Sequence, residues 1–199
     1  MGRTGTLHAW EQERTAPDIQ AVAKGLGGGY QPIGAMLASG QIIDTLRQGS
    51  GAFQHGHTYL AHPMACAAAL EVQKIISEER LLDQVKARGA QLERRLTERF
   101  GNHRHVGDVR GRGLFQAIEL VADRAPRTPF DPALKLNLRI KTAAFEGGLG
   151  CYPMGGTVDG RKGDHILLAP PYIATSGDID MIVDRLGHAV DGALRSIGH

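Results

Sequence analysis

The sequence has few cysteines, few aromatic residues and almost no excess charge of either sign. Cys66 and Cys151 lie far apart and lack the short spacing of a metal site. Acidic and basic residues are interspersed, and the formal net charge is only +2, so we expect neither a nucleic-acid nor a membrane partner. No apolar run is long enough to span a bilayer. Without a recognisable signal peptide, the two thiols favour a reducing, cytoplasmic location.

Glycine, by contrast, is abundant, and it gathers after one lysine. Lys24 ends the short apolar run Ile19–Ala23 and precedes the glycine-rich segment Gly25–Gly29. Glycine accepts positive φ, which allows other groups to approach the ammonium closely. Desolvation of that kind favours a neutral amine, and a neutral amine is what a Schiff base with an aldehyde requires. The pattern indicates an attachment point for pyridoxal phosphate, and the alternative is an ordinary solvated lysine beside a glycine turn.

Histidine is concentrated in a second segment, Phe53–Pro63, which holds His55, His57 and His62. The His-x-His spacing resembles the opening of metallo-hydrolase motifs. However, no aspartate follows within the next few residues and no cysteine or carboxylate is nearby, so we expect no metal. The same segment contains Thr58, whose hydroxyl and neighbouring backbone amides suit a phosphate. The alternative for Thr58 is capping of the helix that follows.

Taken together, these segments resemble the class III aminotransferases, a branch of the pyridoxal-phosphate enzymes of the aspartate aminotransferase fold type. The resemblance covers essentially the whole chain. The segments that carry it are Pro17-Asp18-Ile19, the Lys24 segment, Gln31–Ala35, His57-Thr58-Tyr59 and Pro63. It implies an α/β fold, namely part of the large domain of the fold type I pyridoxal-phosphate enzymes followed by a small α+β domain.

The resemblance also implies roles for individual residues. Lys24 would hold pyridoxal 5′-phosphate and act as general base and acid. Thr58, with His57 beside it, would bind the cofactor phosphate from the neighbouring subunit, so we expect a homodimer. Arg161 lies close to the position of a mobile arginine that grips the substrate carboxylate in many amine-type members. The alternative for Arg161 is a solvated side chain in a turn.

The same resemblance sets the expected organisation of the chain. We expect residues 1–78 to be the C-terminal part of the large, cofactor-binding domain and residues 79–199 to be the small domain. A segment like Gly2–Gly5 closely follows, in the family, a strand whose aspartate binds the pyridine nitrogen. We therefore expect a C-terminal half, whether a fragment, a shortened reading frame or a split protein, and a poor catalyst when isolated.

Local patterns predict the individual elements. We expect a short helix over 7–16, a strand over 19–23, a second strand over 33–39 that is apolar enough for a buried sheet, and a helix over 41–47. Pro63 suits the first turn of a helix that runs to about residue 79, and the period of 81–100 predicts a long amphipathic helix. Farther along we expect a strand over 106–121, a helix over 134–146, strands at 149–152 and 163–171, and a last helix over 178–194 capped by Ser176.

The favoured function is transfer of an amino group from an amine or amino acid to a keto acid through pyridoxal phosphate on Lys24. Related enzymes with the same scaffold, such as aminomutases, a racemase and a decarboxylase, stay open as alternatives. A non-catalytic or partner-dependent fragment is the alternative of a different class.

Overall fold

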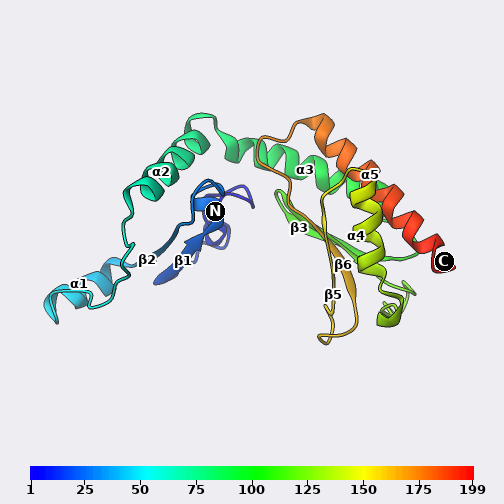
Figure 1. Ribbon diagram of the computed structural model, residues 1–199, viewed down its shortest axis with the longest axis horizontal. Coiled ribbons are helices and arrows are strands. Elements are labelled where there is room, and N and C mark those ends of the chain that lie inside the picture. Colours follow the sequence, from blue (N-terminus) through cyan, green and yellow to red (C-terminus); the bar gives the residue numbers. More distant parts are fainter. The chain divides into compact units, whose positions relative to one another are not determined.

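The computed structural model describes all residues from Met1 to His199. They form two compact units, residues 1–82 and 83–199, and each unit combines helices with an antiparallel sheet (Figure 1). None of the helices has the length and apolar character needed to span a membrane.

The first unit is built around a two-stranded sheet. Its elements, with η for a 3₁₀ helix, are η1 (Ala9–Gln12), β1 (Ile19–Ala23), η2 (Lys24–Leu26), β2 (Gly34–Ala38), α1 (Gly40–Gln48) and α2 (Pro63–Glu78). The strands pair antiparallel, from Ile19 opposite Ala38 to Ala23 opposite Gly34. The Lys24 turn and the glycines after it therefore form the connection between two paired strands.

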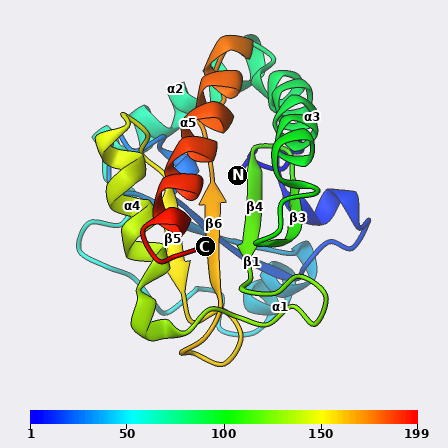
Figure 2. The ribbon, with the colours of Figure 1, turned by 90° about the vertical axis from the view of Figure 1, so that its right-hand side faces the viewer.

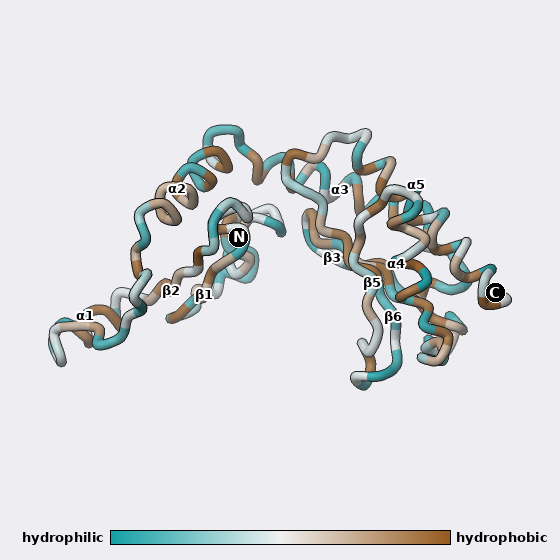
Figure 3. The backbone as a smooth tube through the Cα atoms, in the orientation of Figure 1, coloured by the Kyte–Doolittle hydropathy of each residue, from teal (hydrophilic) through white to brown (hydrophobic).

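The sheet of the first unit is exposed, and the prediction that strand 33–39 is buried is wrong for this chain. Figure 3 shows hydrophobic residues on both strands, yet Ile19, Met36 and Leu37 are 56%, 55% and 44% exposed. The physical reason is that two strands leave side chains on both faces without a covering layer. The helix predicted over 7–16 is also shorter, because only Ala9–Gln12 is helical.

Helix α2 follows the predicted pattern. Pro63 occupies its first turn, where a missing backbone N–H leaves no bond unmade. Ala65, Ala69 and Ile76 are buried on one side of the helix, and their spacing matches the helical period. The small alanine side chains let this helix lie close to the segment that it covers.

The second unit is a four-stranded antiparallel sheet with helices on one face (Figure 2). Its elements are α3 (Leu81–Phe100), β3 (Val106–Arg112), β4 (Phe115–Leu120), η3 (Pro132–Leu134), α4 (Leu136–Glu146), β5 (Tyr152–Gly155), β6 (Asp164–Leu168) and α5 (Ser176–Arg195). The strand order is β3-β4-β6-β5. Alternate residues of β4 and β6 are buried, as expected when one face of a sheet meets a helical layer.

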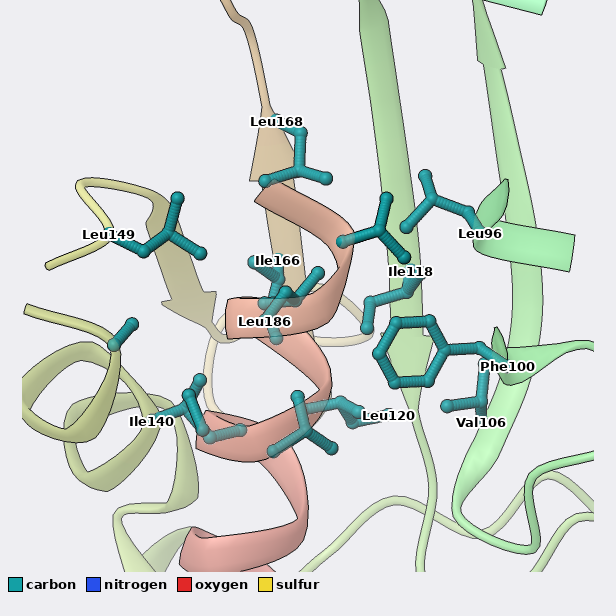
Figure 4. Close-up of a cluster of buried hydrophobic side chains, with 14 of the residues drawn as sticks. Leu96, Phe100, Val106, Ile118, Leu120, Ile140, Leu149, Ile166, Leu168 and Leu186 are labelled. Carbon is teal, nitrogen blue, oxygen red and sulfur yellow. The ribbon is translucent and has the colours of Figure 1, made fainter. Parts of the chain in front are cut away.

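A continuous hydrophobic core joins that sheet to its helices (Figure 4). Leu96 and Phe100 of α3 meet Ile118 and Ile166 of the sheet and Leu186 of α5, and all five are almost fully buried. Burial of each such side chain contributes roughly 1.5–3 kcal/mol relative to exposure. The second unit therefore has an extensive core of its own.

Several boundaries in the second unit differ from the predictions: the helix predicted over 134–146 begins at Leu136, and the strand predicted over 163–171 is Asp164–Leu168. The strand predicted over 106–121 is a hairpin, because the chain reverses at Gly113, which has φ 54°. The strand predicted at 149–152 begins only at Tyr152. The cap of α5 is Thr175 rather than Ser176: the Thr175 hydroxyl accepts the backbone N–H of Asp178 at 3.2 Å, and the Asp178 carboxylate accepts the Thr175 N–H at 2.8 Å.

Candidate active site

Lys24 stands at a strained point of the backbone. It directly follows β1, and its φ is 51°, in the left-handed region that residues other than glycine enter rarely. The turn closes when the N–H of Gly27 donates to the Lys24 carbonyl at 3.2 Å. Backbone conformations of this kind persist only where the surrounding structure holds them, and residues in such conformations cluster at functional sites.

The Lys24 side chain is exposed, and its ammonium makes no hydrogen bond or ion pair. The close neighbours predicted from the glycine-rich sequence are therefore not found around the ammonium in this chain. The reason is that alternate residues of β1, and all residues of β2 except Ala38, are exposed, and no side chain of the unit bonds to the amine. A primary amine without a partner is available to an incoming group.

Two glycines of the segment are required by packing or by backbone conformation. Gly27 is buried, and a Cβ at this position would lie 2.8 Å from Cγ2 of Ile33. Gly28 has φ +59°, and a Cβ there would lie 3.2 Å from Cγ2 of Val72 on α2. The glycine run therefore lets Ile33 from one side and α2 from the other approach the Lys24 turn closely.

Gln73 of α2 is a residue of this region that sequence reasoning missed. Its side-chain Nε2 donates to the carbonyl of Leu26 at 2.9 Å and to that of Gly25 at 3.3 Å. The contact joins residues 47 and 48 positions apart, so local patterns could not predict it. No local signal sets Gln73 apart, because Glu71 and Lys74 are also polar residues of the same helix.

His57 and Thr58 lie in the segment before α2, and both are exposed. The His57 ring packs edge-on against His55 at 5.0 Å and lines a hollow of about 500 Å³. The other lining residues belong to Gln31–Ala35, to Tyr59–His62 and to the start of α2. The Thr58 hydroxyl has no hydrogen-bond partner, and no hydrogen bond joins it to Lys24.

Arg161 belongs to the second unit, in the turn between β5 and β6. The Asp159 carboxylate accepts the backbone N–H groups of Lys162 at 2.7 Å and of Arg161 at 2.9 Å, and these bonds hold the pKa of Asp159 below its ordinary value. The Arg161 guanidinium itself is exposed and unpaired. The structure thus keeps Lys24, His57 and Thr58 in one unit and places Arg161 in the other.

Comparison with known proteins gives the family. The family model for class-III aminotransferases matches residues 1–190. The chain belongs to the class III aminotransferases. An uncharacterized aminotransferase of Schizosaccharomyces pombe is 44% identical over 197 residues. A transaminase structure from the marine bacterium Virgibacillus matches with a TM-score of 0.93 and 35% identity over 99% of this chain, and a pyridoxal-phosphate-bound aminotransferase mutant from Vibrio fluvialis matches with 0.89 and 30%.

These aminotransferases are longer than this chain. The chain spans 43% of the length of the fission-yeast relative and 44% and 42% of the two structures. The predicted family and the predicted α/β class, that of the fold type I pyridoxal-phosphate enzymes, are confirmed. The predicted cofactor is the one that this family uses. Lys24 has an unpaired amine, which is the nucleophile that an aldehyde requires, and Thr58 has an unpaired hydroxyl, which is able to donate a hydrogen bond to a phosphate oxygen.

Proposed function

We propose that this chain is the lysine-bearing part of an aminotransferase that moves an amino group from an amine or amino acid to a keto acid. The observation that carries the proposal is Lys24: an unpaired amine on a left-handed residue, in a glycine turn packed against α2, within the region that matches the family. Pyridoxal phosphate, when bound, supplies the electron sink for this chemistry. Lys24 supplies the amine that holds it.

The chain's own residues then have distinct tasks. With the cofactor bound, the Nζ atom of Lys24 would accept a proton from the substrate Cα as general base and deliver it to the cofactor's C4′ as general acid. A short turn fixed at both ends limits the positions that this amine can reach, which favours a productive geometry. The glycines keep the turn narrow enough for the cofactor to approach the backbone.

Thr58 and His57 are proposed to serve the phosphate across a dimer interface. The free hydroxyl of Thr58 can donate to a phosphate oxygen, and its charge-assisted hydrogen bond would be short and strong. In the proposed homodimer, Thr58 of one subunit and Lys24 of the other would contact the same cofactor.

Arg161 is proposed to bind the substrate carboxylate. A guanidinium offers a planar pair of donors that matches a carboxylate in a bidentate manner. Its side chain is free for this, since the Asp159 turn uses only the backbone of Arg161. We also propose a cytoplasmic location, which is consistent with two unpaired cysteines.

A second candidate function, a partner-dependent part of such an enzyme, is favoured by two observations. Most residues of the β1–β2 sheet next to Lys24 are exposed, and the chain spans less than half the length of its relatives. Absorbance of the purified chain near the cofactor's lysine-bound band, with and without added pyridoxal phosphate, separates the two candidates. A band from the chain alone supports the first, and its absence supports the second.

The first test of the proposed function is chemical labelling of Lys24. The full chain is incubated with pyridoxal phosphate, reduced with borohydride and mapped by peptide mass. We expect the pyridoxyl group on Lys24 and its complete loss from that peptide in Lys24→Arg, because a guanidinium does not form the adduct. A label concentrated on any of the other lysines would overturn the assignment; these are Lys74, Lys86, Lys135, Lys141 and Lys162.

A further inference from the structure

Helix α2 holds the Lys24 turn through one side chain. We propose that Gln73 is a positioning residue for Lys24. Its side-chain amide binds the carbonyls of the turn and keeps Lys24 in the left-handed conformation, and this conformation directs the Lys24 amine toward the cofactor. The inference rests on the proposed function, in which Lys24 carries the cofactor. Gln73 touches neither cofactor nor substrate in this role and acts only through the backbone of the turn.

The two hydrogen bonds between Gln73 and the turn require a side chain that donates. A glutamine amide carries two N–H groups on one nitrogen, and here that nitrogen meets two consecutive carbonyls, Leu26 at 2.9 Å and Gly25 at 3.3 Å. Gln73 is half-buried, so these bonds are partly shielded from water. A side chain that accepts but does not donate would place oxygen against oxygen at the same position.

The turn needs such support. Lys24 has φ 51°, a conformation that is unfavourable for a residue other than glycine and persists only where the surrounding structure holds it. Within the turn, the N–H of Gly27 donates to the Lys24 carbonyl at 3.2 Å. The carbonyls of the next two residues point to α2 and are bound by Gln73. Fixing three successive peptide groups leaves the backbone of Lys24 little freedom to relax.

The polar contact can be separated from the packing around it. Val72, the neighbour of Gln73 on α2, lies against Gly28, where an added Cβ would be 3.2 Å from its methyl group. A substitution at Gln73 can therefore remove the donor and leave the apolar contact in place. The same helix begins at Pro63, in the segment that carries His57 and Thr58, so α2 connects the Lys24 turn with the segment proposed to serve the partner's site.

Hydrogen exchange of the cofactor-free full chain tests the role directly. In Gln73→Leu we expect the Gly27 amide, which closes the turn on Lys24, to exchange about tenfold faster, as for the loss of one net hydrogen bond. Gln91→Leu is the matched control, since the Gln91 amide also donates to a backbone carbonyl, that of Ser176 at 3.0 Å, but in the second unit. Equal exchange of Gly27 in all three chains would overturn the proposal.

Two further variants distinguish donation from shape. Gln73→Glu keeps the length of the side chain but, as a carboxylate, only accepts, so we expect fast exchange as in the leucine variant. Gln73→Lys restores a donor, and we expect protection of the Gly27 amide to return to within about twofold of the wild-type value. If glutamate protects the turn as well as glutamine does, the amide has no positioning role.

Labelling with pyridoxal phosphate and borohydride connects the turn to the cofactor. We expect Lys24 to be labelled several-fold more slowly in Gln73→Glu than in the wild type, and at the wild-type rate in Gln91→Leu. If Lys24 of the wild type is not labelled, the proposed function is contradicted. The hydrogen-exchange result still decides whether Gln73 holds the turn. Normal labelling in a chain whose turn exchanges freely would show that Gln73 holds the turn without positioning the amine.

Discussion

At the scale of single residues, Lys24 shows what a local pattern can reveal. A lysine beside a run of glycines is a contiguous signal, so its place in a turn could be predicted from the sequence. The left-handed backbone at Lys24 itself could not, because lysine has no preference for positive φ and the conformation depends on contacts with α2. The exposure of its amine depends on how many strands surround it, and a short sequence pattern does not predict that number.

Asp164 gives a residue-scale prediction of pH dependence. This carboxyl is buried at the start of β6, and burial raises its pKa, while a backbone hydrogen bond from Asn137 at the start of α4 opposes the rise. The folded state therefore binds the proton more tightly than the unfolded state does. Stability from this group is present below the ordinary carboxyl pKa of 3.8 and is lost as pH rises through the raised value.

Asp164→Asn tests this prediction, because the amide keeps an acceptor for Asn137 and has no charge. We expect the variant to be more stable than the wild type at about pH 7 and to lose that advantage at about pH 3, where the carboxyl is protonated in both states. Urea midpoints across this pH range provide the measurement. A variant less stable than the wild type at neutral pH would show that the ionised carboxylate contributes favourably.

At the scale of elements, helix periodicity predicted more than strand alternation did. The bounds predicted for α3, 81–100, match the structure because its apolar positions keep one period over the whole helix. The prediction of one strand over 106–121 missed the hairpin of β3 and β4, although the glycines at 111 and 113 are a turn signal; the chain reverses at Gly113, which has φ 54°. The cap of α5 shifted by one residue: Thr175 and Ser176 are both good caps, but Asp178, three residues after Thr175, completes a capping box with Thr175.

Gly89 of α3 provides a prediction at the element scale. A Cβ at this position would lie 2.5 Å from Cα of Gly113, so the helix rests directly on the β3–β4 turn. We expect Gly89→Ala to destabilise the second unit by about 1–3 kcal/mol, since backbone must move to accommodate one methyl group. The measurement is the midpoint of urea unfolding.

A second helical glycine is the matched control for that change. Gly192 lies inside α5, and a Cβ there would meet only the end of the Arg195 side chain, at 3.9 Å. Gly192→Ala should stabilise by roughly 0.5–1 kcal/mol, because alanine has the better helix propensity. If both alanines stabilise the protein, the close contact between α3 and the hairpin turn does not restrict residue 89.

At the scale of the whole molecule, the two units differ in how complete they are. The second unit buries an extensive core between its sheet and three helices. In the first, the buried apolar residues come from α2 and the segment just after it, and both strands are exposed. The sequence predicted that β2 would be buried because its apolar run has the composition of a covered strand. What covers such a strand depends on chain segments that a local pattern does not contain.

The proposed sharing of one site between two subunits gives the last prediction, a complementation experiment. Lys24→Asn removes the amine but tolerates the left-handed backbone, and Thr58→Ala removes the hydroxyl. If Thr58 serves the partner's Lys24, a mixed dimer of the two variants contains one intact site and one doubly defective site, because the contacts of a two-fold dimer are reciprocal. Equal mixing with free exchange of subunits makes half of the dimers mixed, and each mixed dimer has one intact site of two. We therefore expect about a quarter of the wild-type number of cofactor sites, measured by pyridoxyl labelling of Lys24.

Two controls accompany this experiment. Each variant alone should bind little cofactor, and mixing the Thr58→Ala chain with a Lys24→Asn, Thr58→Ala double variant should restore no binding. Equal labelling in the two mixtures, with association shown by sedimentation, would place Thr58 in the site of its own subunit or in none.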